Sequence, residues 1–243
     1  MALISRQGTV FDRSYRDFLI KWEQKDEWSF FELTGCPGDL LVHLFYLAEL
    51  AKQKELASSM EWLMFNMTPI ESIERKVIEW KNEETLQVVE YDGEAEEKDE
   101  KQIHDQQDRY HCAEAWRYSL LVYIERVFKW DRKQRRPFSI ARFARTTLDH
   151  VRSCRRTSQT QKQLLLPVFL AGSETTDADM RRFVKGYCKH WAEKSRYNMF
   201  DSASLLLDEI WMASPSQWWG AFIDDKTTAS KGPLETVTQF LFG

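Results

Sequence analysis

Apolar residues recur every three to four positions along most of the chain, which is the spacing of one face of an α-helix. Thr68 and Pro69 add a typical helix start, because threonine can cap a helix and proline fits its first turn. The apolar stripes lie in residues 11–22, 40–51, 70–80, 113–128, 180–191 and 201–211. The pattern predicts a series of amphipathic helices.

Residues 164–180, LLLPVFLAGSETTDADM, change abruptly from apolar to acidic. Helical patterns flank this stretch on both sides, so a buried strand here would have no partner. We expect a buried helix over residues 160–171, with Pro167 in a first turn or at a kink. Gly172 would end that helix, and Thr176 would cap the next one.

The fold class that follows is all-α, an irregular bundle of about 8–11 helices in one domain over residues 1–243. The 9 glycines and 6 prolines are too few for a chain of short strands and turns. Residues 92–108 are expected to be a flexible acidic loop, and residues 224–243 a C-terminal tail. The longest apolar run, Leu164 to Ala171, is far shorter than the roughly 20 residues of a membrane span, so no membrane contact is expected.

The charge distribution and the spacing of the cysteines limit which ligands the chain is expected to bind. The net charge of −4 argues against general attraction of the chain to DNA. Arginines and lysines concentrate in residues 129–156 between apolar positions, which indicates either a solvated helix face against the acidic segment or a nucleic-acid surface. The four cysteines lack C-x-x-C spacing, so we expect free, buried thiols and no metal or other cofactor. They are Cys36, Cys112, Cys154 and Cys188.

Three segments together resemble a known family. They are GCPGDLLVHLFYLAELA, CAEAWRYSLLVYIERVF and LLLPVFLAGSETTDADMRRFVKGY, the last followed by DSASLLLDEIW. In order and spacing they are similar to the fungal-specific transcription factor domain that follows a zinc-binuclear-cluster DNA-binding module. The similarity spans roughly residues 30–215.

The resemblance implies an all-α regulatory domain of a nuclear transcription regulator, with shuttling to the cytoplasm as an additional possibility. Some members of the family bind a lipid inside the helical body, and others dimerise. The six-cysteine zinc cluster is missing from this sequence, which indicates either a fragment of a regulator or a member that has lost DNA binding, and we favour the fragment. DNA contact and zinc would belong to the absent N-terminal module.

Three functional hypotheses are open. In the first, a small apolar ligand binds among aromatic side chains, which in the alternative view simply fill the core. The predicted ligand-binding residues are Phe169, Phe183, Trp191, Trp211, Trp218 and Phe222. In the second, the domain is a scaffold that binds protein partners or a second copy through an exposed apolar patch.

The third hypothesis is an enzyme. Asp201, Ser204 and Asp208 are spaced like part of a terpene-cyclase magnesium motif. The partner D-D-x-x-D motif does not occur upstream, and a helix cap is the favoured explanation of Asp201. No nucleophile-elbow, phosphate-loop or zinc-protease motif occurs in the sequence. The prediction is therefore that the chain is not an enzyme and has no catalytic residues.

Overall fold

The computed structural model describes residues 6, 14, 17, 30–60, 62–82, 100–130, 135–213, 219–220 and 222–223. Within these residues the chain forms nine α-helices, one turn of π-helix and no strand, which confirms the all-α prediction. The elements are α3 (Phe30–Thr34), α4 (Gly38–Ser58), α5 (Thr68–Glu79), α7 (Glu100–Ile124), η1 (Glu125–Lys129), α8 (Phe138–Ser153), α9 (Gln159–Lys162), α10 (Leu165–Glu174), α11 (Ala178–Ser195) and α12 (Asn198–Met212).

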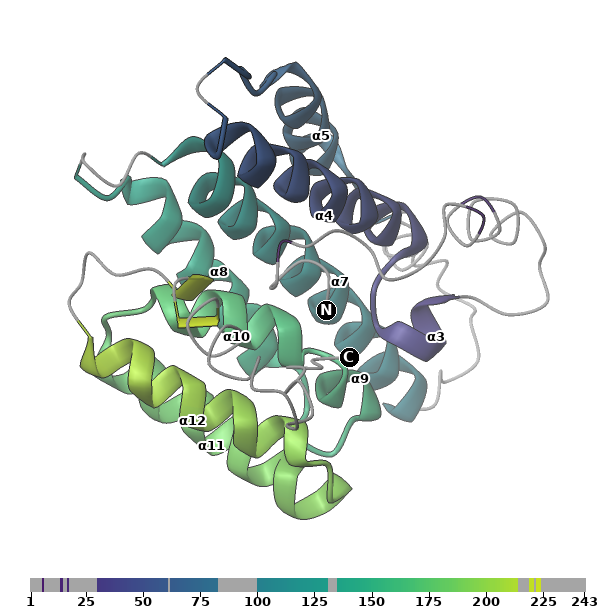
Figure 1. Cartoon of the computed structure of the whole chain (residues 1–243). Coiled ribbons are helices and arrows are strands. Elements are labelled where there is room, and N and C mark those ends of the chain that lie inside the picture. The colour runs from purple at the N-terminus through teal and green to yellow at the C-terminus, as the bar shows by residue number, and fades with distance from the viewer. Residues whose placement is uncertain are drawn as a thin grey trace.

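The helices are arranged around α7 and α10. Figure 1 shows α4 and α5 on one side of α7, the antiparallel pair α11 and α12 on the other side, and α10 between α7 and that pair. Helix α8 packs along α7 and also contacts α10. The short α9 connects the end of α8 to α10 and contacts α7. None of the described helices is long and apolar enough to cross a membrane.

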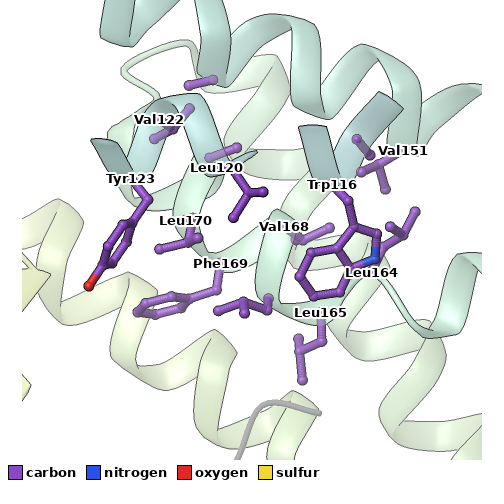
Figure 2. Close-up of a cluster of buried hydrophobic side chains, with 14 of the residues drawn as sticks. Trp116, Leu120, Val122, Tyr123, Val151, Leu164, Leu165, Val168, Phe169 and Leu170 are labelled. Carbon is purple, nitrogen blue, oxygen red and sulfur yellow. The ribbon is translucent and has the colours of Figure 1, made fainter. Parts of the chain in front are cut away.

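Helix α10 occupies the centre of the core. Of its ten residues only Ser173 is not buried. Figure 2 shows Phe169 and Leu170 beside Leu120 and Tyr123 of α7. A helix that is apolar on all sides must be surrounded by other elements, and α10 contacts α7, α8, α11 and α12. The apolar half of the 164–180 stretch is therefore the centre of the molecule.

The structure corrects several predicted boundaries in this stretch. Residues 160–171 are not one helix, because α9 ends at Lys162 and α10 begins at Leu165. Pro167 does lie in the first turn of α10, where its missing N–H has no helical acceptor to lose. Gly172 does not end α10, which continues to Glu174.

The glycine at position 172 instead allows a close helix contact. A Cβ placed there would lie 3.2 Å from Cγ1 of Val184 on α11. The next helix is capped by Asp177 rather than Thr176, because the Asp177 carboxylate accepts hydrogen bonds from the backbone N–H groups of Asp179 and Met180. A side chain one position later thus does what Thr176 was expected to do.

Four other predicted segments have different outcomes in the structure. The expected acidic loop is wrong over residues 100–108, which form the first turns of α7, while residues 83–99 lie outside the described residues. The predicted helix over residues 11–22 lies almost wholly outside them, and the tail at 224–243 lies entirely outside. Helix α5 begins at Thr68 with Pro69 in its first turn, but Thr68 does not act as its cap.

A buried ion cluster joins three elements. The Glu174 carboxylate at the end of α10 lies 2.9 Å from Arg126 Nε of η1 and 3.1 Å from a terminal nitrogen of Arg136. Glu174 and Arg126 are both buried. The Arg126 guanidinium also stacks on Trp130, 4.0 Å from the ring centre. The cluster ties η1 and the segment before α8 to the central helix.

Candidate functional site

The six aromatic residues predicted to bind a ligand are dispersed. Phe169 and Trp191 are fully buried, whereas Phe183, Trp211 and Phe222 are partly buried and pack against the core. Trp218 lies outside the described residues. Of the described members of this set, only Phe183 lines the pocket reported below. The ligand-binding role of the whole set remains a prediction.

A pocket of about 550 Å³ lies between the C-terminal end of α8, the segment leading into α9, and one face of α11. Ligand sites in proteins commonly have volumes of this order. The lining is mixed, with charged, polar and aromatic members. They are Arg152, Arg156, Gln161, Asp179, Arg182, Phe183, Gly186 and Tyr187.

Helix α11 supplies one wall of the pocket. Its five lining residues recur at spacings of three, one, three and one, so they share one face of the helix. Gly186 is in the middle of that face. A Cβ added at Gly186 would have no heavy atom within 4 Å, so no neighbouring side chain requires a glycine there. The missing side chain instead leaves space over the wall of the pocket.

The opposite wall is basic. Arg152 is in the last turn of α8, and Arg156 follows that helix. Both are exposed, and neither forms an ion pair with any described residue. Arg182 pairs with Asp179 across one turn of α11. Three guanidinium groups and one carboxylate thus leave the lining with two net positive charges.

Gln161 of α9 connects the α8 wall of the pocket to the α11 wall through hydrogen bonds. Its side-chain Nε2 donates hydrogen bonds to the carbonyls of Val151 (3.3 Å) and Cys154 (2.9 Å) at the end of α8. Its Oε1 accepts one from Trp191 Nε1 at 3.1 Å, and its backbone carbonyl accepts one from the Tyr187 hydroxyl at 3.0 Å. Gln161 is buried, so these bonds fix the positions of α8, α9 and α11 relative to one another.

The potentially nucleophilic side chains of Cys154, Tyr187 and Cys188 have low reactivity. Burial raises the pKa of the Cys154 and Cys188 thiols to about 12, and it also raises the pKa of the Tyr187 hydroxyl. These groups are therefore protonated at neutral pH and are poor nucleophiles. All four cysteines are buried and free, as predicted. The described residues contain no group of three potential metal ligands.

The aspartates of the enzyme hypothesis have other environments. Asp201 lies exposed in the first turn of α12, whose N-cap residue is Tyr197, so the predicted capping role is wrong. Asp208 forms an ion pair with Lys185 of α11. A negative charge in a first turn and a pair between adjacent helices are ordinary stabilising features.

The chain belongs to the fungal-specific transcription factor domain family, whose model matches residues 2–227. No curated protein and no solved structure is significantly similar to the chain. The family contains transcription factor domains and is not an enzyme family, in agreement with the sequence prediction. The chain is thus a regulatory domain of a fungal transcription factor, and its family implies a nuclear location.

Sequence reasoning missed most of the pocket. The sequence pattern assigns Arg152 and Arg156 to a basic helix face and places Gln161 in a buried helix without a functional role. Gly186 is not singled out by the apolar pattern, although glycine disfavours helix interiors. A glycine in the middle of a predicted helix is the local signal that could have indicated the site.

Proposed function

We propose that this regulatory domain is a sensor whose small-molecule effector binds in the pocket between α8 and α11. The observation that carries the proposal is Gly186. A glycine inside a helix destabilises it by about 1 kcal/mol relative to alanine, and here no packing contact explains the choice. A side chain at this position would project into the pocket.

The hydrogen bonds of Gln161 provide a route by which occupancy could affect the rest of the domain. An effector in the pocket would lie against Gln161 and Tyr187, which join the end of α8 to α11. A ligand shifts a conformational equilibrium only if it binds one state more tightly than the other. An effector that contacts both α8 and α11 would favour the conformation in which the distance between these two helices allows both sets of contacts.

The test uses a pocket-filling variant and a matched control. Gly186→Leu places a branched side chain in the pocket, whereas Ala141→Leu makes a similar addition at an exposed position of α8 away from it. In chemical-shift mapping with a mixture of small fragments, residues 152–162 and 179–190 should respond in the wild type and in Ala141→Leu. The response should disappear in Gly186→Leu. Fragments that gather elsewhere, or that bind Gly186→Leu unchanged, would refute the proposal.

A second measurement addresses regulation directly. Strains that carry Gly186→Leu or Ala141→Leu in the regulator should differ in their transcript profiles, because only the first variant blocks the pocket. Identical profiles would show that the pocket has no part in regulation.

Dimerisation is a second candidate function, and a group of exposed apolar residues close together in sequence favours it. Trp62 is 79% exposed and Met64 is 91% exposed in the connection between α4 and α5, and Leu56, Met60 and Leu63 are exposed nearby in sequence. We define these five residues as the apolar patch. An apolar surface is complementary to itself, so a second copy of the chain related by a two-fold axis is a suitable occupant.

Light scattering over a range of protein concentrations tests this candidate. The wild type should form a dimer, and Trp62→Ser with Met64→Ser should remain a monomer, since each substitution removes a large apolar contact. Replacing exposed Leu205 of α12 by serine is the control, and it should leave the dimer intact. A wild-type monomer at high concentration would refute dimerisation through this patch.

A further inference from the structure

The two walls of the pocket differ in chemistry, and this difference limits the class of effector. The α8 side presents the guanidinium groups of Arg152 and Arg156. The α11 side presents Phe183, Tyr187 and the bare backbone at Gly186, together with the ion pair between Asp179 and Arg182. Resting on the proposed sensor function, we propose that the effector is a small organic anion. Its carboxylate or phosphate group binds Arg152 and Arg156, and its flat apolar part lies over Gly186.

The arginines are available for an external anion. Their neighbours Arg145, Arg155 and Arg182 all pair with aspartates, whereas Arg152 and Arg156 form no ion pair with a described residue. The position of Arg152 at the end of α8 is favourable because the helix C-terminus carries partial negative charge. Arg156 lies beyond the end of α8, so interaction with the helix C-terminus does not account for a positive charge at this position. Guanidinium groups bind carboxylate and phosphate oxygens in a bidentate manner.

The α11 wall offers little further polar recognition. The Tyr187 hydroxyl already donates toward the carbonyls of Gln161 (3.0 Å) and Lys162 (3.2 Å), so it is not available to donate to a ligand. Asp179 is paired with Arg182. The space above Gly186 is open, and the Phe183 ring beside it on α11 suits contact with a planar hydrocarbon group.

A wholly apolar effector fits the pocket less well. It would remove water from two unpaired guanidinium groups and return no hydrogen bond to them. A metal cation is also excluded as the primary ligand, because the lining has two net positive charges and a single carboxylate. An amphipathic anion satisfies both walls at once.

The experiment compares matched probes by titration calorimetry. The probes are 1-naphthyl phosphate and 1-naphthoate as anions and 1-naphthalenemethanol as the neutral analogue with the same ring system. Both anions should bind the wild type more tightly than the alcohol does. Arg152→Gln with Arg156→Gln should weaken binding of the anions by at least about tenfold and leave the alcohol unchanged. Arg75→Gln, an exposed arginine on α5, is the control and should bind all probes like the wild type.

The outcomes separate this inference from the sensor proposal. If the alcohol binds as tightly as the anions and Gly186→Leu abolishes both, the pocket is a ligand site but the anion assignment is wrong. The assignment is also wrong if the double arginine variant keeps its affinity for the anions. If Gly186→Leu has no effect on any probe, the pocket is not the binding site and both proposals fail. Circular dichroism of each variant verifies that the fold is retained.

Discussion

At the scale of single residues, the buried Glu174 is a position where loss of one side chain should be costly. Its carboxylate lies between Arg126 and Arg136, and it ends the central helix α10. Removing water from three charged groups is unfavourable, and their mutual attraction offsets that loss only while all partners are present. The cluster therefore fixes how η1 and α10 meet more than it adds net stability.

We predict that Glu174→Ala lowers the free energy of unfolding by about 3–5 kcal/mol, because it removes the buried carboxylate that pairs with both Arg126 and Arg136. Urea denaturation followed by circular dichroism measures the change. The control is Asp149→Ala, which removes an exposed i,i+4 pair with Arg145 and should lower the same quantity by no more than about 0.5 kcal/mol. Equal losses in the two variants would mean that burial of the cluster is unimportant.

A histidine pair between α7 and α8 gives the second prediction at this scale. Nδ1 of His111 lies 3.0 Å from Nδ1 of His150, so one nitrogen donates and the other accepts. Burial lowers the pKa of both imidazoles below 6.5, and the charges of Asp108 and Glu114 oppose this only partly for His111. Protonating both rings would place two donors face to face and break the hydrogen bond.

The unfolded chain therefore takes up protons at a higher pH than the folded one does. The free energy of unfolding should be greatest above about pH 6.5 and should fall as the pH drops below that value. His111→Gln should make the decline between about pH 7 and pH 5 shallower, as measured by urea titrations across that range. Some slope should remain, because burial also lowers the pKa of His43. An unchanged slope would show that the pair does not control the pH dependence.

At the scale of helices, three glycines differ in their reasons for being glycine. A Cβ added at Gly186 would meet no heavy atom within 4 Å, whereas one added at Gly172 would lie 3.2 Å from Val184 Cγ1. Gly35 has a φ of +67°, and a Cβ added there would lie 2.7 Å from Gln163 Cβ. Gly186→Ala should therefore raise the free energy of unfolding by about 0.5–1 kcal/mol. Gly172→Ala should be less favourable than that by at least about 1 kcal/mol, and Gly35→Ala should be destabilising as well.

Thermal and urea unfolding of the three alanine variants under the same conditions test this order. The expected ranking of stability is Gly186→Ala, then Gly172→Ala, then Gly35→Ala. If Gly186→Ala were the least stable, an unrecognised contact would fill the space above α11, and the pocket would have to be reassigned.

The predicted and observed helices agree in some features and differ in others. The apolar period was sufficient for the helical class and for the burial of residues 164–171, because a continuous apolar segment must be covered by other elements. The stop assigned to Gly172 was wrong, because glycine can serve a helix end or a close helix contact equally well. The pocket was missed because its residues lie on separate elements, and only the folded chain brings Arg152 and Gly186 to one site.

At the scale of the whole molecule, stability should be unevenly distributed. Helix α10 contacts α7, α8, α11 and α12, and its side chains are almost all buried. The connection between α4 and α5 instead exposes Trp62 and Met64 to solvent. Opening α10 requires separation of most of the bundle, whereas opening the α4–α5 connection leaves the rest in place.

Hydrogen exchange followed by mass spectrometry tests this distribution. Peptides covering α10 and the buried part of α7 over residues 115–124 should exchange only through global unfolding, so their protection should fall together in dilute denaturant. Peptides from residues 59–67 should exchange much earlier. Probe binding in the α8–α11 pocket should then slow exchange in α9 and leave residues 59–67 unaffected, since Gln161 joins α9 to the pocket. If α10 exchanged as fast as the α4–α5 connection, α10 could not be the stable centre of the domain. Ligand binding between α8 and α11 could then not shift these helices relative to a rigid core.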